Sequence, residues 1–505
     1  MTPNMMKSFG RKVLPPALAA IPLATLLACA TGMIPLEVIK MTPPAPVGHA
    51  SARHAGRPGP LESAPPTRAA PAAPPAKHVT LTPLEKKYIH ALASGNFSRR
   101  HKAKRALLAL GTPALPALRQ ALADASSPQM RGAMAGLISK LKLMRLMQPT
   151  YVTLHLKHAS LKKIIRQISA QSHVRLTLFN NMVQANGRFN FNETHQPFWQ
   201  AMIDLQKKTS FGLPRYQYGP APAGGLPLML VGNDPPPSSI RGPFIAQAIM
   251  FQRNSTLELS SDPAQQMKPN CTFSLQMLFA CEPRMPVLQG GALVIDKAVT
   301  DTGKSIFKPG VDSTNLWFNP MAGGSGSGFV NFQTVRHMGR RLRILKGHFS
   351  CLVASDVTVL KLKDVFHPKK TRHSTHGITV VFSGLNHVNN QYTATIVLVN
   401  PSGASPLSAV PPPPGQPVYN QNIVQQQANY MGNTAALLGA NGQPLIRQFS
   451  SCQFTPANTT VTITWNTNGA PGLPAPGAPK ELNLSIPLAF HMVKAPFVFR
   501  NLPLP

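Results

Sequence analysis

Acidic residues are scarce in this sequence. Its 505 residues include 16 Asp and Glu but 50 Lys and Arg, which gives a formal net charge of +34. The shortage runs along the whole chain and does not mark one basic domain. Two interpretations stay open: a polyanionic partner, or an acidic external habitat in which carboxylates are partly protonated. Because nucleic-acid binders usually gather their basic residues on one face, we favour the acidic habitat.

The same shortage limits catalytic chemistry, because general acid–base catalysis relies largely on carboxylates and histidines. Glu282 ends an apolar run, and we expect it to pair with Arg284 or another basic neighbour. Asp301 opens an Asp-Thr-Gly-Lys sequence, which predicts a tight hairpin turn. Neither a Gly-x-Ser-x-Gly nor a His-Glu-x-x-His motif is present. We therefore expect no enzyme, no cofactor and no small-molecule substrate.

Two further segments are interpreted as loops. The glycine run 323–328 follows no strand-to-helix switch and lacks the Lys-Ser/Thr of a phosphate loop, so we expect a flexible loop. Histidines share another polar stretch with basic residues: His367, Lys369, Lys370, Arg372, His373 and His376. A metal site needs neutral imidazoles and is opposed by adjacent cations, which favours an exposed basic loop over metal binding.

The N-terminus has the pattern of an export signal. Lys7, Arg11 and Lys12 precede the uncharged, mostly apolar run Val13–Ala28. This run is short for a membrane-spanning helix, and its prolines oppose a stable one. We therefore expect the folded body to be exported, to the periplasm or the outer membrane.

The same run ends in Leu-Leu-Ala followed by Cys29, which resembles the lipobox of bacterial lipoproteins. The resemblance makes Cys29 a lipidation candidate that would attach the protein to a membrane. Leu27 departs from the pattern, since a smaller residue is commoner there. Ordinary cleavage near Ala28 or Ala30 and an uncleaved anchor stay as alternatives.

Cysteine is also rare, with five residues in the chain. With Cys29 set aside, four remain and allow three disulfide pairings: Cys271, Cys281, Cys351 and Cys452. Cys271 and Cys281 flank one strand-like run, in which an extended chain holds them roughly 30 Å apart. We therefore do not expect these two to pair with each other. Four buried free thiols are the equally weighted alternative.

Two regions follow the leader, residues 1–30. Residues 31–79 are rich in Pro and Ala and predict a disordered linker. Residues 80–145 show leucines at helical spacing, and Gly111 is expected to end one helix before Thr112 caps the next. The sequence around this turn, LGTPALPAL, resembles a HEAT-type repeat. The resemblance covers about one and a half repeats and implies a small helical cap that leans on the next domain.

Residues 149–231 predict the element order β-α-β-β-α-β. Strands are expected at 151–156, 174–178 and 187–191 and near Tyr216 and Leu228, with helices from Leu161 and Pro197. The strings VTLHLKHASL and PFWQAM resemble the short N-terminal (STN) domain of secretins and TonB-dependent receptors. That resemblance implies a small periplasmic module that contacts other proteins. No secretin pore or receptor barrel follows, so transport is not implied.

Two features of this module bear on its role. The first helix carries Lys162, Lys163 and Arg166 on its polar side, either a solvated face or a candidate interaction patch. His173 follows the helix where the family usually has glycine, so the turn is expected to be strained or built differently.

Residues 242–366 and 377–505 predict two mainly-β domains, because strand-like runs alternate with turn residues. A repeated order of runs suggests duplicated sandwiches that look immunoglobulin-like. The whole chain is expected to be a multi-domain α+β protein: a helical hairpin region, the βαββαβ module and two β domains. We expect a non-catalytic interaction or scaffold protein that docks other envelope proteins. The alternative is binding of an anionic polymer or lipid surface through the positive charge.

Overall fold

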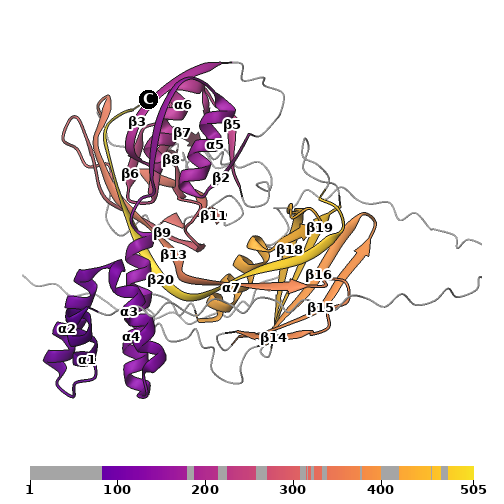
Figure 1. Cartoon of the computed structure of the whole chain (residues 1–505). Helices are drawn as coiled ribbons and strands as arrows, with labels where there is room; N and C mark the ends of the chain where they lie inside the picture. The colour runs from indigo at the N-terminus through magenta and orange to yellow at the C-terminus, as the bar shows by residue number, and fades with distance from the viewer. Residues whose placement is uncertain are drawn as a thin grey trace, which may run out of the picture. The chain divides into compact units, whose positions relative to one another are not determined.

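The computed structural model describes residues 82–178, 187–213, 225–256, 270–307, 314–315, 317–319, 324–332, 338–375, 378–399, 420–455, 458–467 and 476–504. These residues form a multi-domain α+β protein with several antiparallel sheets (Figure 1). The expected leader with Cys29, the linker 31–79 and the strand near Tyr216 lie outside the described residues. None of the helices in the described part of the chain combines the length and apolar character needed to cross a membrane.

The helical region contains α1 (Pro83–Leu92), α2 (Phe97–Leu110), the 3-10 turn η1 (Thr112–Ala114), α3 (Leu115–Asp124) and α4 (Pro128–Leu146). The expected leucine spacing is confirmed, with Leu107, Leu118, Leu137 and Leu141 in one buried cluster. Gly111 ends α2 with a φ of +71°, as predicted. The prediction that Thr112 caps the next helix is wrong, since no side chain caps η1 or α3. A proline in the first turn of each removes an N–H that a cap would bind.

The next module has the predicted element order, with one extra short strand. It comprises β1 (Tyr151–Ser160), α5 (Leu161–Ser172), β2 (Arg175–Leu178), β3 (Arg188–Pro197), α6 (Phe198–Thr209), β4 (Phe211–Gly212) and β5 (Gly225–Leu230). β1 pairs with β3, and a second sheet has the order β2-β5-β4. Both helices bury the apolar faces that the spacing predicts: Leu161, Ile164, Ile165 and Ile168 of α5, and Phe198, Ala201, Met202 and Leu205 of α6.

The two helices of this module end in the same way. The hydroxyl of Ser172 donates to the Ile168 carbonyl at 2.7 Å and accepts from the Val174 N–H at 3.3 Å. Between them His173 takes a left-handed conformation with φ +56°. In α6, Thr209 makes the corresponding bonds, and Ser210 is left-handed with φ +64°. The turn at His173 is therefore built without glycine because a buried hydroxyl holds the neighbouring backbone.

The first β core lies between two five-stranded sheets. One sheet has the order β11-β12-β8-β7-β6 and the other β10-β9-β13-β20-β17. Their bounds are β6 (Ser238–Arg241), β7 (Phe244–Thr256), β8 (Asn270–Cys281), β9 (Val287–Thr300), β10 (Thr314–Asn315), β11 (Trp317–Asn319), β12 (Ser325–Phe332), β13 (Arg341–Lys363), β17 (Ala436–Gly439) and β20 (Pro479–Pro503). Aromatic side chains from both sheets fill this core, among them Phe244, Phe279, Phe349 and Phe497.

The second β core lies between the other end of the β13–β20 sheet and a third sheet, ordered β14-β15-β16-β19-β18. That sheet consists of β14 (Arg372–Thr375), β15 (Ile378–Val388), β16 (Gln391–Val399), β18 (Ile446–Phe454) and β19 (Asn458–Asn466). Helix α7 (Asn420–Thr434) adds Ala428 and Met431 to this core and was not predicted. Its segment is rich in Gln and Asn and has few apolar residues, so the helical period is weak.

The two β cores share one long ribbon. β13 and β20 pair antiparallel from Arg341 opposite Pro503 to Lys363 opposite Glu481 (Figure 1). Polar residues interrupt the apolar pattern of both strands in the sequence; in β13 a bulge at Asp356 carries the strand through. The expected boundary between 242–366 and 377–505 therefore does not separate the cores. The C-terminal half of β20 contributes Phe497 and Phe499 to the first core.

Two segments interpreted as loops are strands. Ser325–Phe332 contains most of the glycine run and pairs with β8 and with β11. Arg372–Thr375, within the basic stretch, pairs with β15. The prediction for the glycine run is wrong for residues 325–328, and that for the basic stretch is wrong only for Arg372 and His373, since His367, Lys369 and Lys370 are exposed and lie outside any strand. In both places the ladder hydrogen bonds of a neighbouring strand outweigh the weak strand propensity of glycine and charged residues. His376 lies outside the described residues.

Candidate functional site

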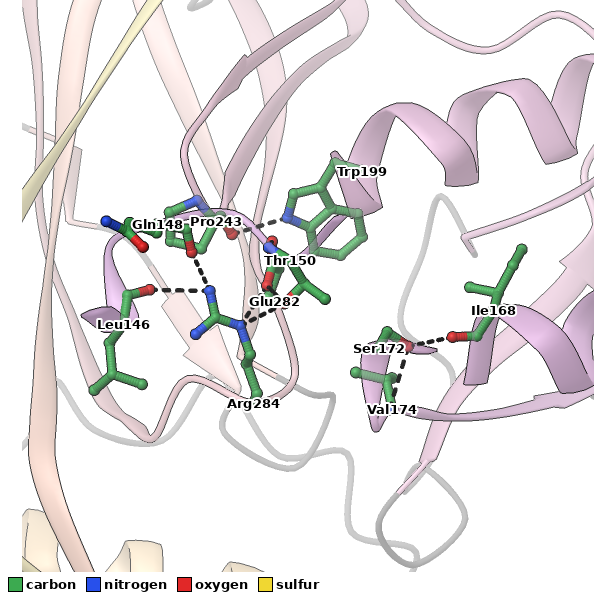
Figure 2. A network of polar contacts seen from close by, with 10 residues as sticks. All are labelled: Leu146, Gln148, Thr150, Ile168, Ser172, Val174, Trp199, Pro243, Glu282 and Arg284. Carbon is green, nitrogen blue, oxygen red and sulfur yellow. Dashed lines mark hydrogen bonds and ion pairs between the residues drawn. The ribbon is translucent and has the colours of Figure 1, made fainter. Parts of the chain in front are cut away.

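Polar groups from three parts of the chain meet around Thr150, which follows α4. The Glu282 carboxylate, one residue beyond β8, is almost fully buried. Thr150 donates its N–H to Glu282 Oε1 at 2.9 Å and its hydroxyl to Oε2 at 2.6 Å (Figure 2). The carbonyl of Thr150 accepts from the Phe198 N–H, at the start of α6, at 2.7 Å. Thr150 thus connects the helical region, the βαββαβ module and the first β core.

Arg284 supplies the positive charge of this junction. Its Nε donates to Glu282 Oε2 at 2.6 Å and to the Thr150 hydroxyl at 2.7 Å. Its Nη2 donates to the carbonyls of Leu146, at 3.2 Å, and Gln148 (Figure 2). A cation at these carbonyls also complements the negative end of the α4 dipole. The predicted pairing of Glu282 with Arg284 is confirmed, and the carboxylate accepts its hydrogen bonds from Thr150 and Arg284, which both have structural roles here.

The turn between β6 and β7 completes the junction. The carbonyl of Pro243 accepts from Trp199 Nε1 at 2.9 Å and from the Glu282 N–H at 2.8 Å. Gly242, with a φ of +57°, approaches the backbone so closely that an added Cβ would lie 2.6 Å from the carbonyl oxygen of Met147. Below this turn, Ile245 and Ala280 pack into the core of the βαββαβ module. The junction is therefore a continuous packed contact between modules.

A second polar cluster lies between α4 and the β13–β20 ribbon. His491 Nε2 is 2.8 Å from the Ser139 hydroxyl and 3.0 Å from the Ser355 hydroxyl, and the two hydroxyls are 2.9 Å apart. Burial lowers the pKa of His491 below its ordinary value of 6.5, which favours the neutral imidazole. This cluster was not predicted, because its three residues are far apart in the chain and none belongs to a motif.

A hydroxyl bonded to an imidazole is also the geometry of a nucleophile and its base. In hydrolases of that type a carboxylate orients the imidazole. Here Asp356, next to Ser355, forms an ion pair with Lys142 of α4 at 2.7 Å. The cluster and this ion pair join the same two elements, so their arrangement supports docking of α4 on the ribbon.

The predicted interaction patch is a solvent-facing surface of α5. Lys162, Lys163 and Arg166 are exposed, while the opposite face of the helix is buried. On the neighbouring strand β1, the side chain of Gln171 hydrogen-bonds to both backbone groups of Thr153. The Thr153 N–H donates to Gln171 Oε1 at 2.8 Å, and the Thr153 carbonyl accepts from Gln171 Nε2 at 2.7 Å. Gln171 therefore protects this edge of β1 against pairing with another strand.

A stronger basic surface lies on α2 and was missed. Arg99, Lys102, Lys104 and Arg105 are exposed along this helix, which has no acidic residue. Phe97 at its start is 73% exposed and stacks on His101 with 6.0 Å between ring centroids. The run of basic residues at 99–105 is the sequence signal for this surface. Exposed cations beside an aromatic ring suit an anionic ligand.

One hollow adjoins the junction on the side of α6 and β6. It has a volume of about 420 Å³ and is lined by Gln196, Pro197, Gln200, Asp204 and Ile240. Gln200 Nε2 lies 3.2 Å from Asp204 Oδ1, so much of the polar lining is already paired. Across the described residues, no group of three or more His, Cys, Asp and Glu could hold a metal ion.

The hairpin turn predicted at Asp301 is confirmed. The Gly303 N–H donates to the Thr300 carbonyl at 3.1 Å, and Gly303 has a φ of +81°. The Asp301 carboxylate accepts from the Arg340 N–H at 3.1 Å. This carboxylate therefore stabilises a turn.

No protein-family model matches the chain, and a search of curated proteins found no match. The HEAT-type and STN-type resemblances rest on the residues quoted above.

Proposed function

We propose that this chain is a non-catalytic cell-envelope protein, exported by its N-terminal segment, whose folded modules dock other proteins. The observation that carries the proposal is the junction around Thr150, Glu282 and Arg284. Its groups are occupied in holding three modules together, which suits a scaffold that presents several surfaces in a set arrangement. The helical region, the βαββαβ module and the β domains resemble HEAT, STN and immunoglobulin-like modules, which commonly contact other proteins.

The docking face that we propose is the polar side of α5, with Lys162, Lys163 and Arg166. Three exposed cations on one helix face suit a partner with an acidic surface. The protected edge at Thr153 favours docking through a helix face over strand addition.

Cross-linking in intact envelopes, followed by pull-down, tests this face. We expect the variant K162E/K163E/R166E to lose specific cross-linked species that the wild type gives. A charge-matched control is K86E/K87E/K140E, which changes three exposed lysines of the helical region. Equal loss in both variants would indicate a general charge effect and reject α5 as the docking face.

The proposed export is tested separately, by mass spectrometry of the N-terminus of the mature protein. Lipid on Cys29, or cleavage near Ala28 or Ala30, supports export. A full-length, unprocessed chain in the cytosol would reject it.

The second candidate function is binding of an anionic polymer or lipid surface. The basic face of α2 beside Phe97 is the observation that favours it. Binding to duplex DNA and to vesicles containing an anionic phospholipid should then weaken steeply with salt, by roughly 10³-fold or more between about 50 and 200 mM if six or more anionic groups are contacted. The variant R99E/K102E/R105E should abolish that binding, whereas protein docking at α5 should persist in that variant and weaken less steeply with salt, because it involves only three cations.

A further inference from the structure

Two cysteines from facing sheets meet in the first β core. Cys281 is the last residue of β8 and Cys351 lies within β13, so they belong to different sheets. Both are fully buried and belong to the same core cluster. Both are free thiols in this structure, and the Cys351 thiol is near enough to raise the pKa of the Cys281 thiol, after burial itself. The sequence left three pairings open, and among the described thiols the fold places Cys281 and Cys351 in one core and Cys452 in another sheet.

Neither cysteine faces the other within a ladder. Cys281 is opposite Phe244 of β7, whereas Cys351 is opposite Gly290 of β9 and Val493 of β20. The backbone at Cys281 is held by the Gly324 carbonyl, which accepts its N–H at 3.0 Å. The thiol contact therefore crosses the interior between the sheets, where a covalent bond would close a long loop of the chain.

We propose that Cys281 and Cys351 form a disulfide that ties the two sheets of the first β core when the protein folds in an oxidising compartment. The oxidant is a small-molecule or protein disulfide. One cysteine thiolate attacks it to form a mixed disulfide and releases one thiol. The second cysteine thiolate then attacks the mixed disulfide, forms the Cys281–Cys351 bond and releases the second thiol. Both cysteines lose a proton, and the two electrons reduce the donor disulfide to two thiols.

The same burial sets when the bond forms. Burial raises the pKa of the Cys281 thiol well above its ordinary value, so the reactive thiolate is rare in the folded protein. An oxidant also has no path to a side chain without exposed surface. The disulfide is therefore expected to form while the sheets assemble, and a chain folded under reducing conditions should keep both thiols when oxidant is added later.

Cys452 provides an internal control. It lies in β18, in the sheet of the second β core, and is only half-buried. Burial raises the pKa of its thiol to about 11. A C452A variant should leave the disulfide unchanged.

The test is to refold the denatured full chain with a mixture of reduced and oxidised glutathione, and in parallel with reductant only. Proteolysis without reduction and mass spectrometry should then find the Cys281 peptide joined to the Cys351 peptide. The melting temperature of the oxidised protein should be higher by about 10 °C, and this difference should vanish in C281A/C351A and persist in C452A. Free thiols at both positions after oxidative refolding, or a pairing of either with Cys271, would overturn the proposal. The peptide mapping uses the wild-type chain, so its outcome does not depend on the folding of a variant.

That the disulfide forms in the cell rests on the proposed function, namely on export of the protein to an oxidising compartment. Cells are lysed with an alkylating agent that traps free thiols, and the same peptides are mapped. A trapped disulfide supports both parts. Free thiols in the cellular protein, with a disulfide after refolding in vitro, would reject folding in an oxidising compartment and leave the geometry intact.

Discussion

Helix α4 contacts the β part of the molecule in two places that differ in chemistry. At its C-terminal end, a buried ion pair between Glu282 and Arg284 binds the last carbonyls and Thr150. In its middle, Ser139 meets a partly buried histidine, and Lys142 pairs with a carboxylate that is 41% exposed. The first contact depends on a carboxylate that is 1% exposed, whereas the second depends on a titratable ring and on an ion pair whose carboxylate is open to water. We therefore expect the first to dominate stability and the second to respond to pH.

The largest effect is expected from E282Q. The substitution leaves the Arg284 guanidinium beside a neutral amide, and breaking a buried pair commonly costs about 3 kcal/mol or more. Denaturant unfolding followed by circular dichroism measures the loss. The control is E193Q, which breaks a more exposed pair with Lys208 and should cost below about 1 kcal/mol. Equal losses of unfolding free energy in E282Q and E193Q would contradict the expectation that the buried carboxylate matters more.

Gly242 tests the close approach at the junction. The variant G242A places a Cβ against the Met147 carbonyl and should destabilise the protein by about 2 kcal/mol. The control is G303A. Gly303 also has a positive φ, but an added Cβ there would have no atom within 4 Å. It should cost only about 1 kcal/mol for the strained backbone. The same unfolding measurement compares them, and a larger loss in G303A would count against a tight junction.

Acid should weaken the second contact. Because burial lowers the pKa of His491 from 6.5, the unfolded chain binds a proton more readily than the folded one. Its contribution to stability is therefore fully present above about pH 6.5 and declines as the pH falls below that value. The denaturant midpoint should fall between about pH 7 and 5, and H491Q should reduce that slope while E282Q keeps it. If the denaturant midpoint of H491Q fell with pH as steeply as that of the wild type, His491 would not be the source of the acid sensitivity.

The smallest effect is expected from K142A. Removing a partly exposed ion pair with Asp356 should cost at most about 1 kcal/mol, and the difference from wild type should shrink in high salt. Unfolding at two salt concentrations measures it. A loss as large as that of E282Q would show that the two contacts are equally important.

Much of the βαββαβ module followed from local patterns. The apolar spacing in α5 and α6 predicted the buried faces, and the sequence from β1 to β3 predicted the strands. The pairing of Glu282 with Arg284 was also accessible, because two residues of opposite charge are two positions apart. The rest of the junction was not, since Thr150 and Arg284 are 134 positions apart and belong to different modules.

The two β cores show what local sequence patterns could not predict. Repeated strand runs suggested two separate duplicated domains, but β13 and β20 pass through both cores, and α7 adds side chains to the second. Strand propensity does not say which strand is the neighbour, and a bulge at Asp356 looks in sequence like the end of a strand. A glycine run became part of β12 for the same reason, since β8 supplied its partners.

The amino-acid sequence by itself determined the kinds of elements and their order in the module, because hydrophobic period, proline and glycine act over a few neighbouring residues. Only the tertiary structure decided that one ribbon serves two cores, that two thiols meet across an interior, and that a buried carboxylate secures the end of α4. Those contacts join residues separated by tens to hundreds of positions. Their free energy depends on the simultaneous packing of distant segments, which no local pattern records.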